Sequence, residues 1–508
     1  MRLVKKWVII ILAVCVSFGN WYGQRKPAKT DGTFKNIIFI LGDDHSSNVI
    51  GAYGNKIIRT PNLDRMAKSG ILFEDAFVSC PLCSPSRQSI LTGKYPHATG
   101  VSILKSSFPE DQVTIAKYLA PQGFKTAIIG KNHFNNDFNH GFELKIERKD
   151  YEKYLTTNPP QKLPDSIKVR PPWKPFVDPA NIWLNAEGLP SKQYDKEQAG
   201  TFYANRAIDF IQKNKDNRFL LWIGFEEPHS PFNFPVEYAK KYDPKKIVLP
   251  QGSPEDDRWV PEIFKNLTDE QKKGITASYY SSVEFLDKNI GLVLNAVEKA
   301  GLSDNTIIIY LGDNGYQLND HKRFEKHTMW EQSVRVPLII QAGDKYGRNR
   351  RVQALTSFVD LVPTAIDALG LKALPTAQGK SFLPLLKQQT KTYRDFIFSE
   401  YLEDNKAMIR TPKWKYVFTS GKADLALGYN TGNPPPGILH FLYDEVNDPK
   451  ETHNLANEAD KKAVILDLQQ KMLGVFEQTH PKGKLPGHLS TDEKLVIYCD
   501  PPELTVKF

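Results

Sequence analysis

Cysteine is scarce in this chain, with four residues in 508. Small secreted proteins that depend on disulfides carry many more, so the fold cannot rest on a dense disulfide framework. Cys80 and Cys83 form one C-x-x-C pair, a spacing used by redox and zinc sites. A second such pair is absent, and the Pro-Ser-Arg that follows has no role in a zinc knuckle, so this interpretation is the weaker one. Cys80 and Cys499 either pair or stay free, and the sequence leaves both open.

A stable membrane span is not predicted. The apolar run Trp7–Phe18 is too short to cross a bilayer comfortably. It follows three basic residues and precedes small residues, which is typical of a secretory signal, here assigned to residues 1–24. We therefore expect an exported protein, periplasmic or secreted. Cys15 faintly resembles a lipoprotein attachment site, but the large Val14 before it favours simple cleavage.

Internal repeats, low-complexity tracts and nucleic-acid-binding motifs are also missing. Lysine and arginine number 67 against 58 acidic residues, a net charge of +9. This mild basic excess suits an anionic substrate, and a merely solvated surface would give it as well. Apolar residues make up 40% of the chain, enough for one large domain or two unequal ones.

Four continuous apolar runs read as buried strands. They alternate with helical patterns such as Phe202–Lys213 and Gly274–Ala300, which predicts a large, mostly parallel α/β sheet flanked by helices. The predicted strands are Ile37–Leu41, Phe124–Gly130, Phe219–Phe225 and Thr306–Gly312.

Charged or imidazole side chains come shortly after each of these strands in the sequence. Parallel strands end at one edge of a sheet, where ligands bind, so the sequence predicts one site there. The side chains concerned are Asp43, Asp44, Lys131, His133, His229, Asp313 and Asn314. The aspartates and the asparagine offer only oxygen, which favours Ca²⁺ or Mg²⁺ over Zn²⁺.

The stretch Cys80–Gly100 carries the most unusual pattern. It places a thiol, Cys83, just before a turn of helix that Pro85 can start and that Ser84 or Ser86 can cap. A helix start favours an anion, and Arg87 adds a fixed positive charge. A nucleophile beside an anion-binding helix start indicates chemistry on a charged oxyanion ester.

Cys83-Ser84-Pro85-Ser86-Arg87, followed after four residues by Thr92-Gly93, resembles the signature of the formylglycine-dependent (type I) sulfatases. That family lies in the alkaline phosphatase superfamily. The resemblance implies an alkaline phosphatase-like fold and oxidation of Cys83 to formylglycine by a sulfatase-maturating enzyme. It also implies a Ca²⁺ site, preferred over Mg²⁺, whose ligands are Asp43, Asp44, Cys83, Asp313 and Asn314.

Phe324–Pro337 resembles another sulfatase segment and puts Lys326 in the place of the sulfate-binding lysine. Glu325 stands where many members have glycine. The resemblance implies that Lys131, His229 and Lys326 bind the sulfate and that Arg87 orients the hydrated aldehyde. His229 would donate a proton to the leaving alcohol and His133 would act as base on the diol. Three further residues of the segment are expected to be structural: Thr328, Glu331 and Arg335. Two histidines either line the pocket or lie on the surface, and the sequence favours neither position: His321 and His327.

Between His140 and Gly200 the pattern becomes irregular and rich in proline, tryptophan and cations. Such loops often bind substrate. Trp173 or Trp183 can stack on a sugar ring, and Arg170 or Lys174 can bind a further sulfate. The alternative, which the sequence favours equally, is a packed surface loop in which the tryptophans are simply buried. The predicted domains are a catalytic domain over residues 35–390 and a smaller C-terminal α+β subdomain with a short antiparallel sheet over residues 391–480. Residues 481–508 form a tail without an assigned role.

The sequence thus predicts a secreted sulfuric ester hydrolase acting on sulfated sugars from polysaccharides. A phosphonate or phosphodiester monoesterase of the same superfamily is the alternative enzyme. A catalytically silent binder of sulfated glycans is the alternative from another class. The sugar, the sulfate position, exo or endo action, and the oligomeric state are not specified by the sequence.

Overall fold

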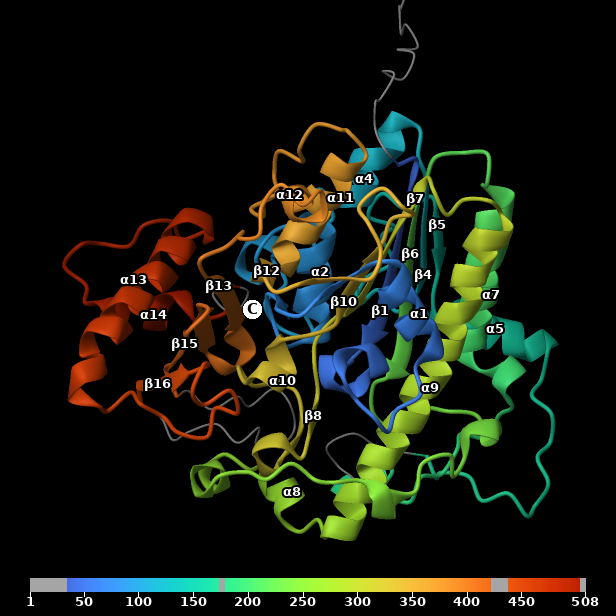
Figure 1. The fold of residues 1–508 in the computed structure, drawn as a ribbon, viewed down its shortest axis with the longest axis horizontal. Coiled ribbons are helices and arrows are strands. Elements are labelled where there is room, and N and C mark those ends of the chain that lie inside the picture. Colours follow the sequence, from blue (N-terminus) through green and yellow to red (C-terminus); the bar gives the residue numbers. More distant parts are fainter. Residues whose placement is uncertain (1–33, 173–178, 422–436, 503–508) are drawn as a thin grey trace, which may run out of the picture.

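A large sheet of eight strands forms the centre of the computed structural model, which describes residues 34–172, 179–421 and 437–502 (Figure 1). The predicted signal peptide, and with it Cys15, lies outside these residues. Across the sheet the order is β11 (Arg350–Val352), β2 (Ile71–Phe73), β10 (Leu338–Gln341), β7 (Thr306–Gly312), β1 (Asn36–Asp43), β6 (Phe219–Pro228), β4 (Lys125–Gly130) and β5 (Leu144–Ile146).

The four predicted strands are confirmed as β1, β4, β6 and β7, which lie side by side and run parallel. Gly42 pairs with Gly312, so the ends of β1 and β7 are level. Strand β10 runs antiparallel to both of its neighbours, and the sheet is therefore mixed although mostly parallel. The sequence analysis did not predict β10 or the three short strands β2, β5 and β11.

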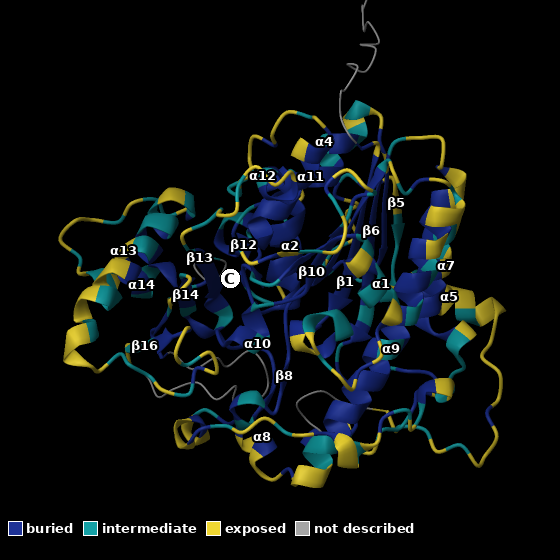
Figure 2. Cartoon of the chain, in the orientation of Figure 1, coloured by how far each residue is buried: buried dark blue, intermediate teal, exposed yellow. Residues whose placement is uncertain are grey.

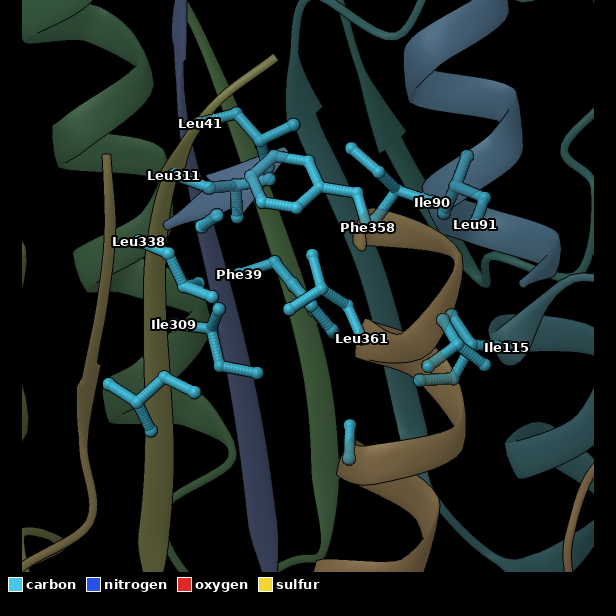
Figure 3. Packing of buried hydrophobic residues seen from close by; sticks show 14 of the residues in the cluster. Phe39, Leu41, Ile90, Leu91, Ile115, Ile309, Leu311, Leu338, Phe358 and Leu361 are labelled. Atoms are coloured by element: carbon cyan, nitrogen blue, oxygen red, sulfur yellow. The ribbon is translucent and has the colours of Figure 1, made fainter. Parts of the chain in front are cut away.

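Helices cover both faces of the sheet because side chains of each strand alternate between two apolar clusters. Figure 3 shows one face, where Phe39, Ile309 and Leu338 pack against side chains of the covering helices. This face is covered by α2 (Cys83–Thr92), α4 (Ile115–Leu119), α11 (Leu361–Ala368) and α12 (Leu383–Leu386). The other is covered by α1 (Pro61–Ser69), α7 (Ala199–Lys213) and α9 (Asp269–Lys299).

The strands and the inward faces of these helices are buried, while exposed residues gather on the outer helix surfaces (Figure 2). Helix α9 begins at a capping box, where the Thr268 hydroxyl accepts from the backbone N–H of Gln271 at 3.2 Å. Within the described residues, no helix is both long enough and apolar enough to cross a membrane.

A second unit follows the large sheet. Its antiparallel strands are β13 (Ile397–Tyr401), β14 (Lys406–Arg410), β15 (Trp414–Thr419) and β16 (Leu439–Asp444). Helix α13 (Lys462–Thr479) packs on this sheet. The tail, which had no assigned role from the sequence, contains α14 (Thr491–Tyr498). Its Leu495 and Tyr498 are buried in one apolar cluster with side chains of the antiparallel strands and of α13. The small antiparallel sheet predicted for the C-terminal part is thus confirmed.

The three cysteines of the described residues are buried and form no disulfide, so Cys80 does not pair with Cys499. Burial raises the pKa of Cys80 well above its ordinary value, which keeps that thiol protonated. A C-x-x-C zinc knuckle therefore has no support in this geometry.

Candidate active site

The carboxyl ends of the central strands bring the predicted polar side chains to one place. Asp43 is the last residue of β1 and Asp44 follows it. Lys131 comes directly after β4, and Asp313 directly after β7. Backbone N–H groups of Asp44 and Asn314 both donate to the Asp313 carboxylate, at 3.0 and 2.8 Å, which locks the two strand ends together.

Helix α2 begins at Cys83 itself, so the thiol is on the first residue of the helix and not, as the motif predicted, just before a turn started by Pro85. The predicted capping role of Ser84 and Ser86 is wrong, because neither hydroxyl bonds to the first turn. Ser86 Oγ instead donates to the backbone carbonyl of Asp313, and Ser84 Oγ donates to that of His133 at 3.4 Å. Both serines thus attach the helix start to the loops that carry other site residues.

Two lysines lie against the aspartates. Lys131 forms an ion pair with Asp43, and Lys326 forms one with Asp44. Lys326 Nζ is also 3.7 Å from Cys83 Sγ. Burial raises the pKa of the Cys83 thiol, although both ammonium groups oppose this effect. Burial alone would lower the pKa of each lysine, but the neighbouring carboxylates raise it, so both lysines stay charged.

Two histidines complete the cluster. His229 Nδ1 is 2.7 Å from the carbonyl of Ser230, so Nδ1 must carry a proton and donate it. This leaves Nε2, 3.6 Å from Asp44 Oδ2, free to gain or give a proton. Burial lowers the pKa of His229, and burial with the Lys131 charge lowers that of His133 well below its usual range. His133 is therefore neutral near pH 7, and its Nδ1 is buried without a hydrogen-bond partner.

Several carboxylate and amide oxygens here lack partners. Asp43 Oδ1, Asp44 Oδ2 and Asn314 Oδ1 are buried and accept no hydrogen bond. Buried acceptors are normally satisfied, so three orphaned oxygens from neighbouring strand ends fit a cation bound between them. Within the described residues, Asp43 and Asp44 also group with His229 as side chains close enough to hold one metal ion.

A cavity of about 540 Å³ opens onto this cluster. Asp43, Lys131, His133 and His229 line it together with Arg170. Further lining residues that the sequence analysis did not assign to the site are Asn136, Arg148, Glu226 and Asn233.

Sequence reasoning also missed Gln88, which is buried on α2 one residue after the motif. Its Nε2 donates to the carbonyls of Asn132 and His133, at 3.1 and 2.8 Å, and so fixes the loop that carries His133. The amide next to Arg87 was the available signal, but nothing local tells which loop it would meet.

Comparison with models of protein families identifies the family of this chain. The sulfatase family model matches residues 35–371, about two thirds of the chain. The chain belongs to the sulfatase family. It is therefore a sulfuric ester hydrolase with the alkaline phosphatase-like fold that the sequence predicted. A second model, described as the C-terminal part of N-sulphoglucosamine sulphohydrolase, matches residues 319–478.

Known sulfatases align along nearly the whole chain. An N-acetylglucosamine-6-O-sulfatase of Bacteroides thetaiotaomicron is 28% identical, over 90% of this chain and 88% of its own length. A solved sulfatase-fold structure in complex with its substrate D-glucosamine-2-N,6-O-disulfate superposes with a TM-score of 0.70 at 23% identity, covering 88% of this chain and 98% of that one. The phosphonate monoester hydrolase of Agrobacterium radiobacter has a TM-score of 0.73 at 22% identity, covering 88% and 96%. Structural similarity at this level of identity shows the shared fold and does not distinguish hydrolysis of sulfate esters from hydrolysis of phosphonate esters.

Glu325, where many sulfatases have glycine, keeps the turn that glycine would form. Its φ is +77°, in the left-handed region that favours glycine. The side chain is buried and accepts a hydrogen bond from the Tyr316 hydroxyl at 3.1 Å. Burial, with the nearby Asp44, raises the pKa of Glu325 to about 7. The departure therefore adds a buried carboxyl group beside Lys326, on a residue whose φ lies in the region that favours glycine.

Of the remaining candidate residues, some are buried away from the cavity and one lines it. His321 pairs with Asp256 and stacks on Trp330, and His327 stacks on Tyr401; both are buried and neither lines the cavity. Trp183 is 1% exposed, so it is a core residue and cannot stack on a sugar. Arg170 does line the cavity. Trp173 and Lys174 lie outside the described residues.

Proposed function

We propose that this sulfatase is exported and hydrolyses sulfate esters on oligosaccharides derived from sulfated polysaccharides. The observation that carries the reaction is the thiol at the start of α2, held beside two lysines and two histidines where four strands end. The carbohydrate part rests on the relatives, because an N-acetylglucosamine-6-O-sulfatase matches over most of both chains. The open, polar cavity is large enough for a sugar ring.

The catalytic group is proposed to be formylglycine, formed from Cys83 by a maturating enzyme. In its hydrated form this group supplies one hydroxyl as the nucleophile for sulfur and a second through which the bound sulfate is eliminated. The buried thiol itself is a poor nucleophile because its pKa is raised. Arg87, fixed by Asp313 and the Lys131 carbonyl, is proposed to orient the group.

A divalent cation is proposed to bind the oxygens of Asp43, Asp44, Asp313 and Asn314, next to Cys83. The unpartnered oxygens described above support it. An oxygen-only donor set suits Ca²⁺ or Mg²⁺ better than Zn²⁺, and the preference for Ca²⁺ rests on the resemblance to sulfatases. When bound, the cation would lower the pKa of a hydroxyl group and offset negative charge.

The lysines and histidines take the remaining roles. Lys131 and Lys326 are proposed to hold sulfate oxygens as charge develops on them; the charge of both lysines acts on Cys83, and Lys326 Nζ is 3.7 Å from its sulfur. His229 is proposed to donate a proton from Nε2 to the leaving oxygen in its doubly protonated form, which the carboxylates of Asp44 and Asp43 favour against burial, while its Nδ1–H stays bonded to the Ser230 carbonyl. His133, neutral near pH 7, is proposed to accept the proton of the second hydroxyl.

The test is sulfate release from a panel of sulfated oligosaccharides and 4-nitrophenyl sulfate. Protein co-expressed with a formylglycine-generating enzyme is compared with Cys83→Ala, and peptide mass confirms conversion of Cys83. We expect release by the converted protein, none by Cys83→Ala, and a loss of at least about 100-fold on chelator treatment. Ca²⁺ should restore activity better than Mg²⁺.

Other outcomes contradict specific parts. Faster turnover of phosphodiesters or phosphonates than of any sulfate ester would favour the alternative enzyme. Glycan binding without turnover, in protein with converted Cys83, would favour a silent binder. Sulfate release from 4-nitrophenyl sulfate but from no saccharide would support the proposed sulfate-ester hydrolysis and contradict the proposed carbohydrate substrate.

A further inference from the structure

Cations that line the active-site cavity are almost all paired with carboxylates. Lys131 pairs with Asp43. Arg148 Nη1 is 2.9 Å from Glu226 Oε2. Lys149 Nζ is 2.8 Å from Glu147 Oε1. The charges of Arg148 and Lys149 are thus largely offset within the protein, and Lys131 is already assigned to the sulfate that is removed, so none of the three is available for a second anion.

Arg170 differs from all of them. Among the described residues it has no carboxylate within ion-pair distance. To the part of the chain that the structure describes, its side chain donates one hydrogen bond, from Nη2 to Asn233 Oδ1 at 2.6 Å, and its Nε is buried without an acceptor there. The bond to Asn233 attaches Arg170 to the loop that carries His229, four residues earlier, so the guanidinium belongs to the same wall of the cavity.

The charge on this arginine persists although its surroundings do not favour it. Burial lowers the pKa of Arg170 to about 10, with no carboxylate to oppose the effect, and the group is still protonated at neutral pH. A desolvated guanidinium without a counter-charge is costly, and an anion that enters the cavity would remove that cost. Guanidinium binds carboxylate and sulfate-like oxyanions with short, charge-assisted hydrogen bonds.

We propose that Arg170 binds a second anionic group of the substrate, a carboxylate or a further sulfate, while Lys131, Lys326 and His229 hold the sulfate that is removed. This inference rests on the proposed function and narrows it. The preferred substrate is a saccharide with at least two acidic groups, and a neutral sugar with one sulfate is a poorer one. The carboxylate and the second sulfate share the chemistry that Arg170 recognises, and the substrates tested separate them.

The experiment compares Arg170→Gln, Arg170→Lys and the parent enzyme on three oligosaccharides. One carries a single sulfate and no other acid, one adds a uronic acid carboxylate, and one adds a second sulfate. Loss of a charge-assisted hydrogen bond is expected to lower kcat/KM of Arg170→Gln about 10-fold to 100-fold on the preferred doubly acidic substrate, mostly through KM. The loss on the singly acidic sugar should be several-fold smaller, and Arg170→Lys should recover part of the difference.

Arg148→Gln is the matched control, because it removes an arginine from the same cavity that is already paired with Glu226. Its ratio of kcat/KM between doubly and singly acidic substrates should stay at the parent value. Equal losses on all three substrates by Arg170→Gln, or an equal change of the ratio by Arg148→Gln, would overturn the proposal. Whichever doubly acidic sugar shows the selective loss identifies the second anion.

Binding without turnover separates this inference from the proposed reaction. Calorimetry with Cys83→Ala and with Cys83→Ala/Arg170→Gln measures Kd for the same three saccharides. A 10-fold to 100-fold weaker Kd confined to a doubly acidic saccharide supports the subsite even if the parent enzyme releases no sulfate. Equal Kd values for the two proteins on every saccharide would reject the subsite even if hydrolysis is observed.

Discussion

Arg87 is a single buried side chain that holds three strand ends together. Its Nε donates to Asp313 Oδ2 and its Nη1 to the Lys131 carbonyl, both at 2.6 Å. Its Nη2 is 3.9 Å from Asp43 Oδ1. One planar guanidinium therefore fixes the ends of β7 and β4 and lies close to that of β1. The sequence predicted a positive charge at this helix start, but the division of its hydrogen bonds between the ends of β7 and β4 is a property of the folded sheet.

Replacement of Arg87 by lysine should be severe despite the unchanged charge. One ammonium group cannot reach the Asp313 carboxylate and the Lys131 carbonyl together, so buried acceptors lose their partners. We expect Arg87→Lys to lower the free energy of unfolding by about 2–4 kcal/mol and sulfate release by at least about 100-fold. Denaturant unfolding and initial rates measure both. Arg65→Lys, at an exposed ion pair on α1, should change neither; unchanged values for Arg87→Lys would contradict the role given to its geometry.

At the scale of elements, α1 begins without a cap of its own. Thr60 at its N-cap makes no capping bond, and Asp287 in the middle of α9 takes that role. The Asp287 carboxylate accepts from the backbone N–H groups of Asn62 and Leu63, at 3.1 and 2.8 Å. Pro61 at the first position suits a helix start. Nothing in the sequence indicated that the first N–H groups of α1 would be satisfied by a helix more than two hundred residues later.

Loss of this remote cap should destabilise the fold. Asp287→Ala leaves buried N–H groups unpaired, and we expect the free energy of unfolding to fall by about 2–4 kcal/mol. Asp287→Asn keeps one acceptor oxygen and should cost about half as much. Chemical denaturation of the three proteins measures the differences. Equal stability of the parent protein and Asp287→Ala would show that water satisfies the N-terminus of α1 equally well.

For the whole molecule, a buried cluster of charges joins the large sheet to the C-terminal unit. Glu331, in α10 (Glu331–Val334), lies 2.8 Å from Arg335 Nε, just before β10. Across the boundary it lies 2.8 Å from Lys415 Nζ and 3.3 Å from Arg410 Nε. The sequence analysis expected Glu331 and Arg335 to be structural, and their position supports that role. Burial alone would raise the pKa of Glu331, but these three cations overcome it and lower the pKa to about 2.

The junction should therefore weaken in acid. Because the folded-state pKa of Glu331 lies below the unfolded value near 4.5, its contribution is present in full above pH 4.5. It is lost as pH falls toward 2. The contribution is on the order of 3 kcal/mol. Glu331→Gln should reduce stability near pH 7 by about that much and make unfolding less dependent on pH between 4.5 and 2.

Denaturant unfolding of the parent protein and Glu331→Gln at pH 7, 4.5 and 3 tests this expectation. Glu298→Gln is the matched control, because that carboxylate forms only an exposed ion pair with Arg65. Its pH profile should follow the parent. A constant difference between Glu331→Gln and the parent at every pH would mean that the cluster stabilises the junction without titrating in this range.

The sequence alone determined the four central parallel strands, the edge at which they end and the type of chemistry there. These follow from local pattern, since apolar runs of strand length bury themselves and Asp43, Lys131, His229 and Asp313 each follow one directly. The specific motif around Cys83 added the family. Tertiary structure decided what depends on contacts between distant segments: the cap from Asp287, the split donors of Arg87, the pairing of Glu331 and the unpaired charge of Arg170. The physical reason is that hydrogen bonds and ion pairs are set by proximity in the folded chain, and neighbours along the sequence do not record it.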